Sequence, residues 1–235
     1  MTHHDAAFRG VFVTGTDTGV GKTLVACEIV RRLRAQSLAP GVIKPIETGV
    51  GPEGPLDALA LRAAAASNMP LEWVCPQQFA LPAAPNVAAE AEGRKVDLDA
   101  IDTAMTRVME QHECVIAEGA GGLLVPLGEC TTMADLAARY DFPLVVVCRA
   151  ALGTLNHTRL TLEAAAARGL EVLGLVISHG SEAISDADAA NLEDLRQNPG
   201  ARVLGEIPPL APGDAVPGPA LDVEPLLRAL GGRRG

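Results

Sequence analysis

The sequence has few aromatic residues and little positive charge. Only 3% of its 235 residues are Phe, Trp or Tyr, and 19 Lys and Arg residues face 29 Asp and Glu residues, which gives a formal net charge of -10. Proteins that bind nucleic acids need a basic surface to neutralise phosphates, and many stack bases on aromatic side chains. The composition therefore argues against a nucleic-acid partner, and any anionic ligand has to be held by a local site.

Long apolar runs and paired cysteines are also missing. The longest uninterrupted apolar stretch, Leu144–Cys148, is too short to cross a bilayer, and residues 1–10 lack the apolar segment of a signal peptide. The five cysteines form no CxxC pair and are odd in number, so neither a zinc site nor a disulfide framework is indicated. We expect a cytoplasmic protein with core thiols and no membrane partner.

Short apolar runs alternate with segments of helical periodicity along the whole chain. Strands are expected at 11–14, 41–43, 114–117, 144–148, 172–178 and 202–207, and helices at 22–34, 56–66, 97–111, 133–140, 154–168, 188–196 and 223–230. Residues 72–79 are expected to form an extra strand or irregular structure, and 208–219 a surface loop. The pattern predicts an α/β fold with a doubly wound, mostly parallel sheet and helices on both faces, as a single domain over 1–235.

A glycine-rich loop follows the first expected strand and opens the first helix, which is the position of a nucleotide-phosphate loop (P-loop). It reads Gly15, Thr16, Asp17, Thr18, Gly19, Val20, Gly21, Lys22, Thr23. Backbone N–H groups here can face phosphates, while Lys22 can reach the β- and γ-phosphates and Thr23 can bind Mg²⁺. The alternative is a glycine-rich turn with an exposed lysine. Thr16 stands where the common pattern has its first glycine, which favours the P-loop branch of synthetases and partition ATPases.

Three further charged residues lie where predicted elements begin or end. Lys44 follows the second strand, where a surface lysine is the common alternative. Asp57 opens a predicted helix and could simply cap it. Glu118 closes an apolar strand, and because a buried carboxylate is costly without a partner, a cation is its natural neighbour.

Six short motifs together give the chain a resemblance to dethiobiotin synthetases. They lie in order at 14–23, 44–49, 57–61, 118–122, 153–157 and 205–208, so the resemblance spans nearly the whole chain. It implies a P-loop NTPase fold and an ATP-dependent cyclo-ligase of biotin biosynthesis. The implied reaction carboxylates 7,8-diaminopelargonate with CO₂ and closes the ureido ring through a carbamic-phosphoric anhydride, releasing ADP and phosphate.

The resemblance also implies roles for individual residues. Lys22 and Lys44 flank the reacting carbamate, and Thr23, Asp57 and Glu118 hold Mg²⁺. Besides the P-loop, the nucleotide contacts are Ser178, Glu206, Ile207 and Pro208; Ser178 replaces an asparagine common in the family, which leaves the strictness for ATP open. The substrate contacts are Thr18, Lys44, Thr48, Gly153, Thr154, Leu155 and Asn156, the last four reaching a carboxylate across a homodimer interface.

Two other functions share this kind of P-loop. An ATPase switch of the MinD/ParA type has a signature lysine early in the loop, where this chain has Asp17, and no basic amphipathic helix for membrane attachment is visible at the C-terminus. A cobyrinate amidase needs a glutamine-hydrolysing domain for which 235 residues leave no room. His157 and His179 have no metal-ligand spacing and are expected to be non-catalytic.

Overall fold

A six-stranded parallel sheet forms the centre of the protein, as the alternating pattern predicted. The computed structural model describes residues 9–180, 184–210, 216 and 220–231. In the sheet the strands run in the order β2-β5-β1-β6-β7-β8, and every pairing is parallel. Their bounds are β1 Arg9–Gly15, β2 Gly41–Ile43, β5 Cys114–Gly122, β6 Leu144–Arg149, β7 Val172–Ser178 and β8 Val203–Ile207.

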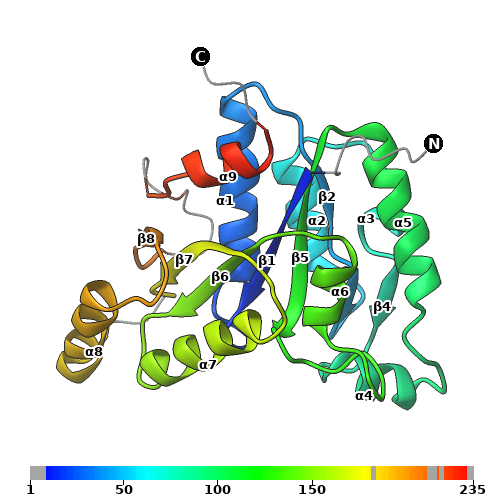
Figure 1. Ribbon diagram of the computed structural model, residues 1–235. Helices are drawn as coiled ribbons and strands as arrows, with labels where there is room; N and C mark the ends of the chain where they lie inside the picture. The colour runs from blue at the N-terminus through cyan, green and yellow to red at the C-terminus, as the bar shows by residue number, and fades with distance from the viewer. Residues whose placement is uncertain (1–8, 181–183, 211–215, 217–219, 232–235) are drawn as a thin grey trace.

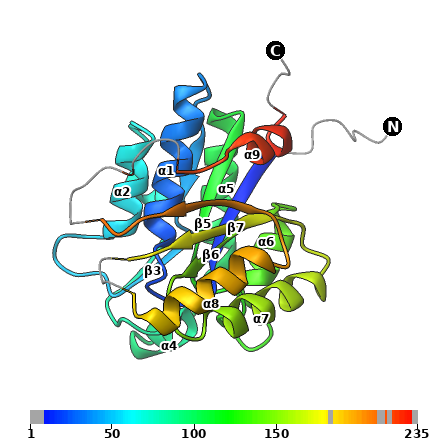
Figure 2. The same ribbon diagram turned by 90° about the vertical axis from the view of Figure 1, so that its left-hand side faces the viewer.

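Helices cover both faces of this sheet, which confirms the doubly wound architecture. The helices α1 and α9 lie on one face, and α6 and α7 on the other (Figures 1 and 2). Each predicted helix is present, with ends that differ by at most two residues. Their bounds are α1 Lys22–Ala35, α2 Leu56–Ala64, α5 Leu98–Gln111, α6 Met133–Arg139, α7 Thr154–Ala166, α8 Asp186–Gln197 and α9 Glu224–Ala229.

The central strand β5 is longer than predicted, because it continues past Glu118 into a glycine-rich stretch. Gly122 pairs with Gly15 at the start of the P-loop, after a shift in register between Val13 and Gly15. A side chain at Gly119 would place its Cβ 2.8 Å from Cε1 of Phe12, so glycine lets β5 pass closely over its neighbour. Glu118 thus lies inside the strand rather than at its end.

A small second sheet lies beside the first. It pairs β3 (Ile46–Thr48) with β4 (Gln77–Phe79) in parallel, and the short helices α3 (Leu71–Val74) and α4 (Pro85–Ala91) flank β4 in the sequence. The expected extra strand is confirmed for Gln77–Phe79, but the segment before it is helical. The three-residue strand β3 and the helix α4 were not predicted, since elements this short leave too little periodicity to detect.

The thiols behave as core groups. Cys27, Cys75, Cys114 and Cys148 are buried, Cys130 is exposed, and all five are free. Burial raises the pKa of Cys114 and of Cys148 to about 11, so these thiols stay protonated. In the described part of the chain no helix is both long and apolar enough to span a membrane. Much of the predicted loop 208–219 falls outside the described residues.

Candidate active site

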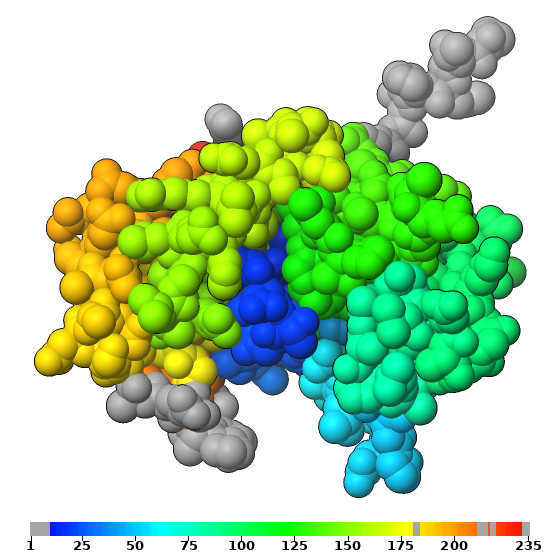
Figure 3. Space-filling model, turned by 90° about the horizontal axis from the view of Figure 1, so that it is seen from below, coloured from blue at the N-terminus to red at the C-terminus, as the bar shows by residue number. Residues whose placement is uncertain are grey.

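The P-loop lies at the carboxyl edge of the sheet, between β1 and α1. Viewed toward this edge, the N-terminal segment that carries the loop is at the floor of a hollow, between the segments of α7 and of the β5–α6 region (Figure 3). Gly21 is the N-cap of α1 and has a φ of 93°, a left-handed value that glycine adopts without strain. A Cβ at Gly21 would lie 2.5 Å from Oγ of Ser178, so Ser178 packs directly against the P-loop.

Lys22 is buried rather than exposed, which excludes the reading of this loop as a turn with a surface lysine. Only 7% of the residue is accessible, and its Nζ donates a hydrogen bond of 3.0 Å to the carbonyl oxygen of Asp17. Burial, together with the positive charge of Lys44, lowers the pKa of Lys22 to about 8. An anion bound beside Nζ would favour the protonated form.

Lys44, between β2 and β3, joins α2 and β5 in one cluster. Its Nζ donates to Oε1 of Glu118 at 2.5 Å, to Oδ2 of Asp57 at 2.9 Å and to the carbonyl oxygen of Gly119 at 3.3 Å. The hydroxyl of Thr23 donates to the same Oε1 of Glu118 at 2.9 Å. Lys44 is therefore not a surface lysine, because only 3% of the residue is accessible to solvent.

The electrostatics of the cluster favour a charged Lys44. Burial alone would lower its pKa, but the charges of Glu118 and Asp57 outweigh this effect and raise the pKa above its ordinary value. For Asp57, burial acts to raise the pKa, yet the charge and hydrogen bond of Lys44 bring it below its ordinary value. The fully buried Glu118 has a raised pKa because desolvation exceeds the attraction of Lys44.

The residues predicted to bind Mg²⁺ meet in this cluster. Oε2 of Glu118 is buried and has no hydrogen-bond partner in the described structure. Since buried polar atoms normally have a partner, this oxygen is suited to bind a cation. Asp57 is not the N-cap of α2, since Pro55 holds that position, and its carboxylate reaches Lys44 instead. No group of three or more His, Cys, Asp or Glu side chains with metal-binding geometry occurs among the described residues. The donor set here is two carboxylates and a hydroxyl, which suits Mg²⁺ bound together with phosphates and water.

One residue of this region was missed from the sequence. Glu47, on β3, is 7% exposed and accepts hydrogen bonds of 3.0 Å from the backbone N–H groups of both Asp57 and Ala58. Glu47 lies within the motif at 44–49, but the resemblance implied no role for it and its position has no periodic signal. Only the packing of β3 against the start of α2 reveals the contact.

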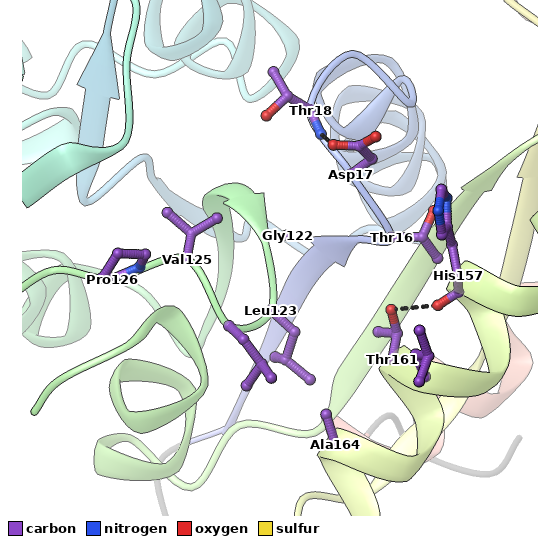
Figure 4. Close-up of a pocket in the computed structure, with 12 residues that line it drawn as sticks. Thr16, Asp17, Thr18, Gly122, Leu123, Val125, Pro126, His157, Thr161 and Ala164 are labelled. Atoms are coloured by element: carbon purple, nitrogen blue, oxygen red, sulfur yellow. Dashed lines mark hydrogen bonds between the residues drawn. The ribbon is translucent and has the colours of Figure 1, made fainter. Parts of the chain in front are cut away.

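A cavity of about 390 Å³ lies between the P-loop, the segment after β5 and α7. Figure 4 shows Thr16, Asp17 and Thr18 on one side, Leu123 and Val125 on another, and α7 opposite. Of the predicted substrate contacts, Thr18 lines this cavity. Thr48 and residues 153–156 do not line it, whereas His157 on the first turns of α7 does.

A second cavity, of about 380 Å³, lies on the other side of the P-loop. Gly19, Val20, Gly21 and Ser178 line it, together with His179, which the sequence had not suggested. Glu206, a predicted nucleotide contact, makes an ion pair with Arg196 and a hydrogen-bond contact with the ring of His179. Ile207 is buried and Pro208 is half-buried, and both follow Glu206 at the end of β8.

The start of α7 has the form of an open helix terminus. Gly153 is its N-cap with a φ of 89°, and no side chain caps the helix. Thr154 is 1% exposed, Leu155 is half-buried and Asn156 is exposed. Leu152 and Leu160, which flank these residues, expose 72% and 54% of their surface.

This fold and this site define a nucleotide-binding α/β protein of the P-loop class. A family model described as an AAA domain matches residues 9–215. Two solved structures share the fold at a TM-score of 0.50: a putative plasmid partition protein of Borrelia burgdorferi bound to AMPPNP, 11% identical, and a MinC:MinD complex of Aquifex aeolicus, 12% identical. The alignments cover 94% of this chain in both cases, and 97% and 86% of the respective solved chains.

Curated relatives define the family more narrowly. An ATP-dependent dethiobiotin synthetase of Anaeromyxobacter sp. (strain Fw109-5) is 47% identical over 200 residues, which cover 85% of this chain and 87% of the relative. One of Bacillus subtilis (strain 168) is 36% identical over 204 residues, covering 86% and 88%. The chain belongs to the family of ATP-dependent dethiobiotin synthetases.

Proposed function

We propose that this chain converts 7,8-diaminopelargonate, CO₂ and ATP into dethiobiotin, ADP and phosphate, as a cytoplasmic enzyme of biotin biosynthesis whose single synthetase domain spans residues 1–235. The observation that carries the proposal is the second buried lysine of the phosphate site. Lys44 lies within hydrogen-bond distance of Asp57 and Glu118, and burial together with the charge of Lys44 lowers the pKa of Lys22. Two buried cations beside a P-loop suit a reaction in which one anion attacks another.

The first step joins an amine of the substrate to CO₂ and forms a carbamate. The amine must lose its proton to act as a nucleophile, and Lys22 and Lys44 disfavour a neighbouring ammonium while they stabilise the anionic product. Thr18 and Thr48 are the proposed contacts to the substrate, Thr18 from the wall of the cavity beside the P-loop. No nucleophilic side chain is needed.

In the second step the carbamate oxygen attacks the γ-phosphate of ATP, and the P–O bond to ADP breaks. The second amine then attacks the carbonyl of the carbamic-phosphoric anhydride, which closes the five-membered ring and expels phosphate. Lys22 and the backbone of 15–23 hold the phosphates, and Ser178 and residues 206–208 are the proposed contacts to the rest of the nucleotide. Mg²⁺, held by Thr23, Asp57 and Glu118, would neutralise charge on the phosphates.

The proposed assembly is a homodimer in which residues 153–156 bind the substrate carboxylate of the neighbouring subunit. The uncapped start of α7 offers backbone donors to an anion. The exposed Leu152 and Leu160 on either side are suited to an apolar subunit contact.

A coupled assay tests the function directly. Nucleotide cleavage is measured with and without 7,8-diaminopelargonate and bicarbonate, and the product is identified by mass. We expect cleavage only when both are present, with one dethiobiotin formed for each ADP. Cleavage that is independent of the diamine would instead favour an ATPase switch of the MinD/ParA type, the alternative that shares this kind of P-loop.

A further inference from the structure

The first turn of α2 is held from outside the helix. Helices begin with backbone N–H groups that have no partner within the helix, and a side chain at the N-cap usually accepts one of them. The N-cap of α2 is Pro55, which has no side-chain acceptor. Both oxygens of Glu47, on a different element, take this role: Oε1 accepts from Asp57 and Oε2 from Ala58, each at 3.0 Å.

This turn carries a charged residue of the active site. Oδ2 of Asp57 lies 2.9 Å from Nζ of Lys44, although the side chain of Asp57 is 42% exposed. Because solvent covers part of this carboxylate, packing alone does not hold it, and its position depends on its hydrogen bond from Lys44 and on the backbone of α2. Glu47 contacts that backbone through its two hydrogen bonds.

Glu47 and Lys44 lie on one short segment of chain, from the end of β2 into β3. The segment therefore holds Asp57 twice, through its backbone N–H at Glu47 and through its carboxylate at Lys44. A shift of α2 would have to break both contacts. This double attachment links the geometry of a helix terminus to that of the proposed metal and carbamate site.

We propose that Glu47 is a positioning residue, which sets the carboxylate of Asp57 against Lys44 and the Mg²⁺ site by accepting two backbone hydrogen bonds from α2. The proposal rests on the role of Asp57 in the proposed function. It requires no contact between Glu47 and substrate, nucleotide or metal. Groups that orient a metal ligand affect metal affinity about 10- to 100-fold when they are mutated.

The test compares Glu47→Gln with a matched helix cap elsewhere. Gln has the same shape, but one of its two acceptors becomes an NH₂ group that faces an N–H. The control is Asp97→Ala, because Asp97 caps α5, a different helix, through a 2.9 Å hydrogen bond from the N–H of Ala100. Two quantities are measured: amide hydrogen exchange in the nucleotide-free protein, and the Mg²⁺ concentration for half-maximal activity.

In Glu47→Gln we expect faster exchange at the N–H groups of Asp57 and Ala58, and a half-saturating Mg²⁺ concentration raised about 10-fold or more. At saturating Mg²⁺, kcat should recover most of its wild-type value. Asp97→Ala should speed exchange at Ala100 and leave the Mg²⁺ requirement unchanged. Glu47→Asp keeps the charge but is one methylene too short to reach both N–H groups, so it should fall between wild type and Glu47→Gln and serves if the Gln variant does not fold.

Asp57→Asn separates this inference from the proposed function. If Asp57→Asn raises the Mg²⁺ requirement while Glu47→Gln matches Asp97→Ala, the positioning role of Glu47 is wrong and the proposed function stands. If Asp57→Asn leaves the Mg²⁺ requirement unchanged, the metal role of Asp57 in the proposed function is wrong. Unchanged exchange at Asp57 and Ala58 in Glu47→Gln would overturn the inference in either case.

Discussion

Nζ of Lys44 lies 2.5 Å from Oε1 of Glu118, across 74 positions of sequence. Both side chains are almost inaccessible, at 3% and 0% exposure. Two charges taken out of water are costly, and each is tolerated only because the other is present. The pair therefore makes the stability of the nucleotide-free protein depend on residues of the active site.

Removing one partner of this pair should destabilise the protein more than removing both. Lys44→Met leaves Glu118 buried without its cation, and such a change typically costs about 3–5 kcal/mol. Adding Glu118→Gln removes the unpaired charge, so the double variant should recover part of that loss. Urea unfolding of the two single variants and the double variant, without Mg²⁺ or nucleotide, measures the coupling. Strictly additive losses would show that the pair is not energetically linked.

Lys44 also separates the two functional classes. The second lysine of a partition ATPase is the signature lysine of its P-loop, where this chain has Asp17, whereas the proposed carbamate chemistry uses Lys44 after β2. Lys44→Ala should lose dethiobiotin formation and keep nucleotide binding, measured by mass spectrometry of the product and by calorimetry. Lost nucleotide affinity with intact product formation would contradict this assignment.

Lys22 should be required for turnover. A P-loop lysine stabilises charge that develops on the transferred phosphoryl group, and its loss costs several kcal/mol, so Lys22→Ala should reduce kcat by about 100-fold or more. The matched control is Lys95→Ala, since Lys95 is exposed and lies outside the P-loop. If the Lys22 variant keeps near-normal turnover, the nucleotide site lies elsewhere.

Nucleotide binding should take up a proton at alkaline pH. Burial and Lys44 lower the pKa of Lys22 to about 8 in the nucleotide-free protein, so at pH 9 this amine is mostly neutral. The phosphates favour its charged form, which raises its pKa in the complex. Affinity should then fall as pH rises above 8, by up to about tenfold per unit. Calorimetry of MgATP binding in buffers of different ionisation enthalpy should show uptake approaching one proton at pH 9 and little at pH 7. If nucleotide binding takes up no proton at either pH 7 or pH 9, Lys22 is not the titrating group.

The sheet and its helices were predictable because their signals are local. The apolar run of β6 and the helical spacing of apolar residues in α1 can each be recognised within one short stretch of sequence. Of the small sheet only β4 was expected, within 72–79, whereas β3 was missed because a three-residue strand has too little periodicity and pairs with a distant segment.

The candidate site divides in the same way. The P-loop was found from its spacing, and Lys44, Asp57 and Glu118 from their places at the ends of the predicted elements and from the family resemblance. That Lys44 bridges the two carboxylates is a tertiary fact, which no spacing contains. The role of Glu47 was not predicted for the same reason, because its hydrogen-bond partners are backbone groups of another element.

The start of α7 should bind the carboxylate of the substrate for the neighbouring subunit. The helix begins at Gly153 without a side-chain cap, so its backbone donors survive side-chain mutation. Asn156→Ala should therefore weaken substrate binding only partly. A diamine that lacks the carboxylate should bind much more weakly, because the helix terminus loses its anion while the amines still meet Lys22 and Lys44.

Dilution tests the subunit part of this prediction. If the partner supplies half of each site, specific activity should fall as the protein is diluted below the dissociation constant of the dimer, in step with the dimer fraction measured by mass photometry. Leu152→Glu is the sharper variant, because a charge on this 72% exposed side chain should block an apolar contact while leaving the fold of one subunit intact. Its nucleotide affinity should stay near wild type while its KM for the diamine rises. Full activity in a demonstrated monomer, or equal affinity for diamines with and without the carboxylate, would mean that the start of α7 has only a structural role.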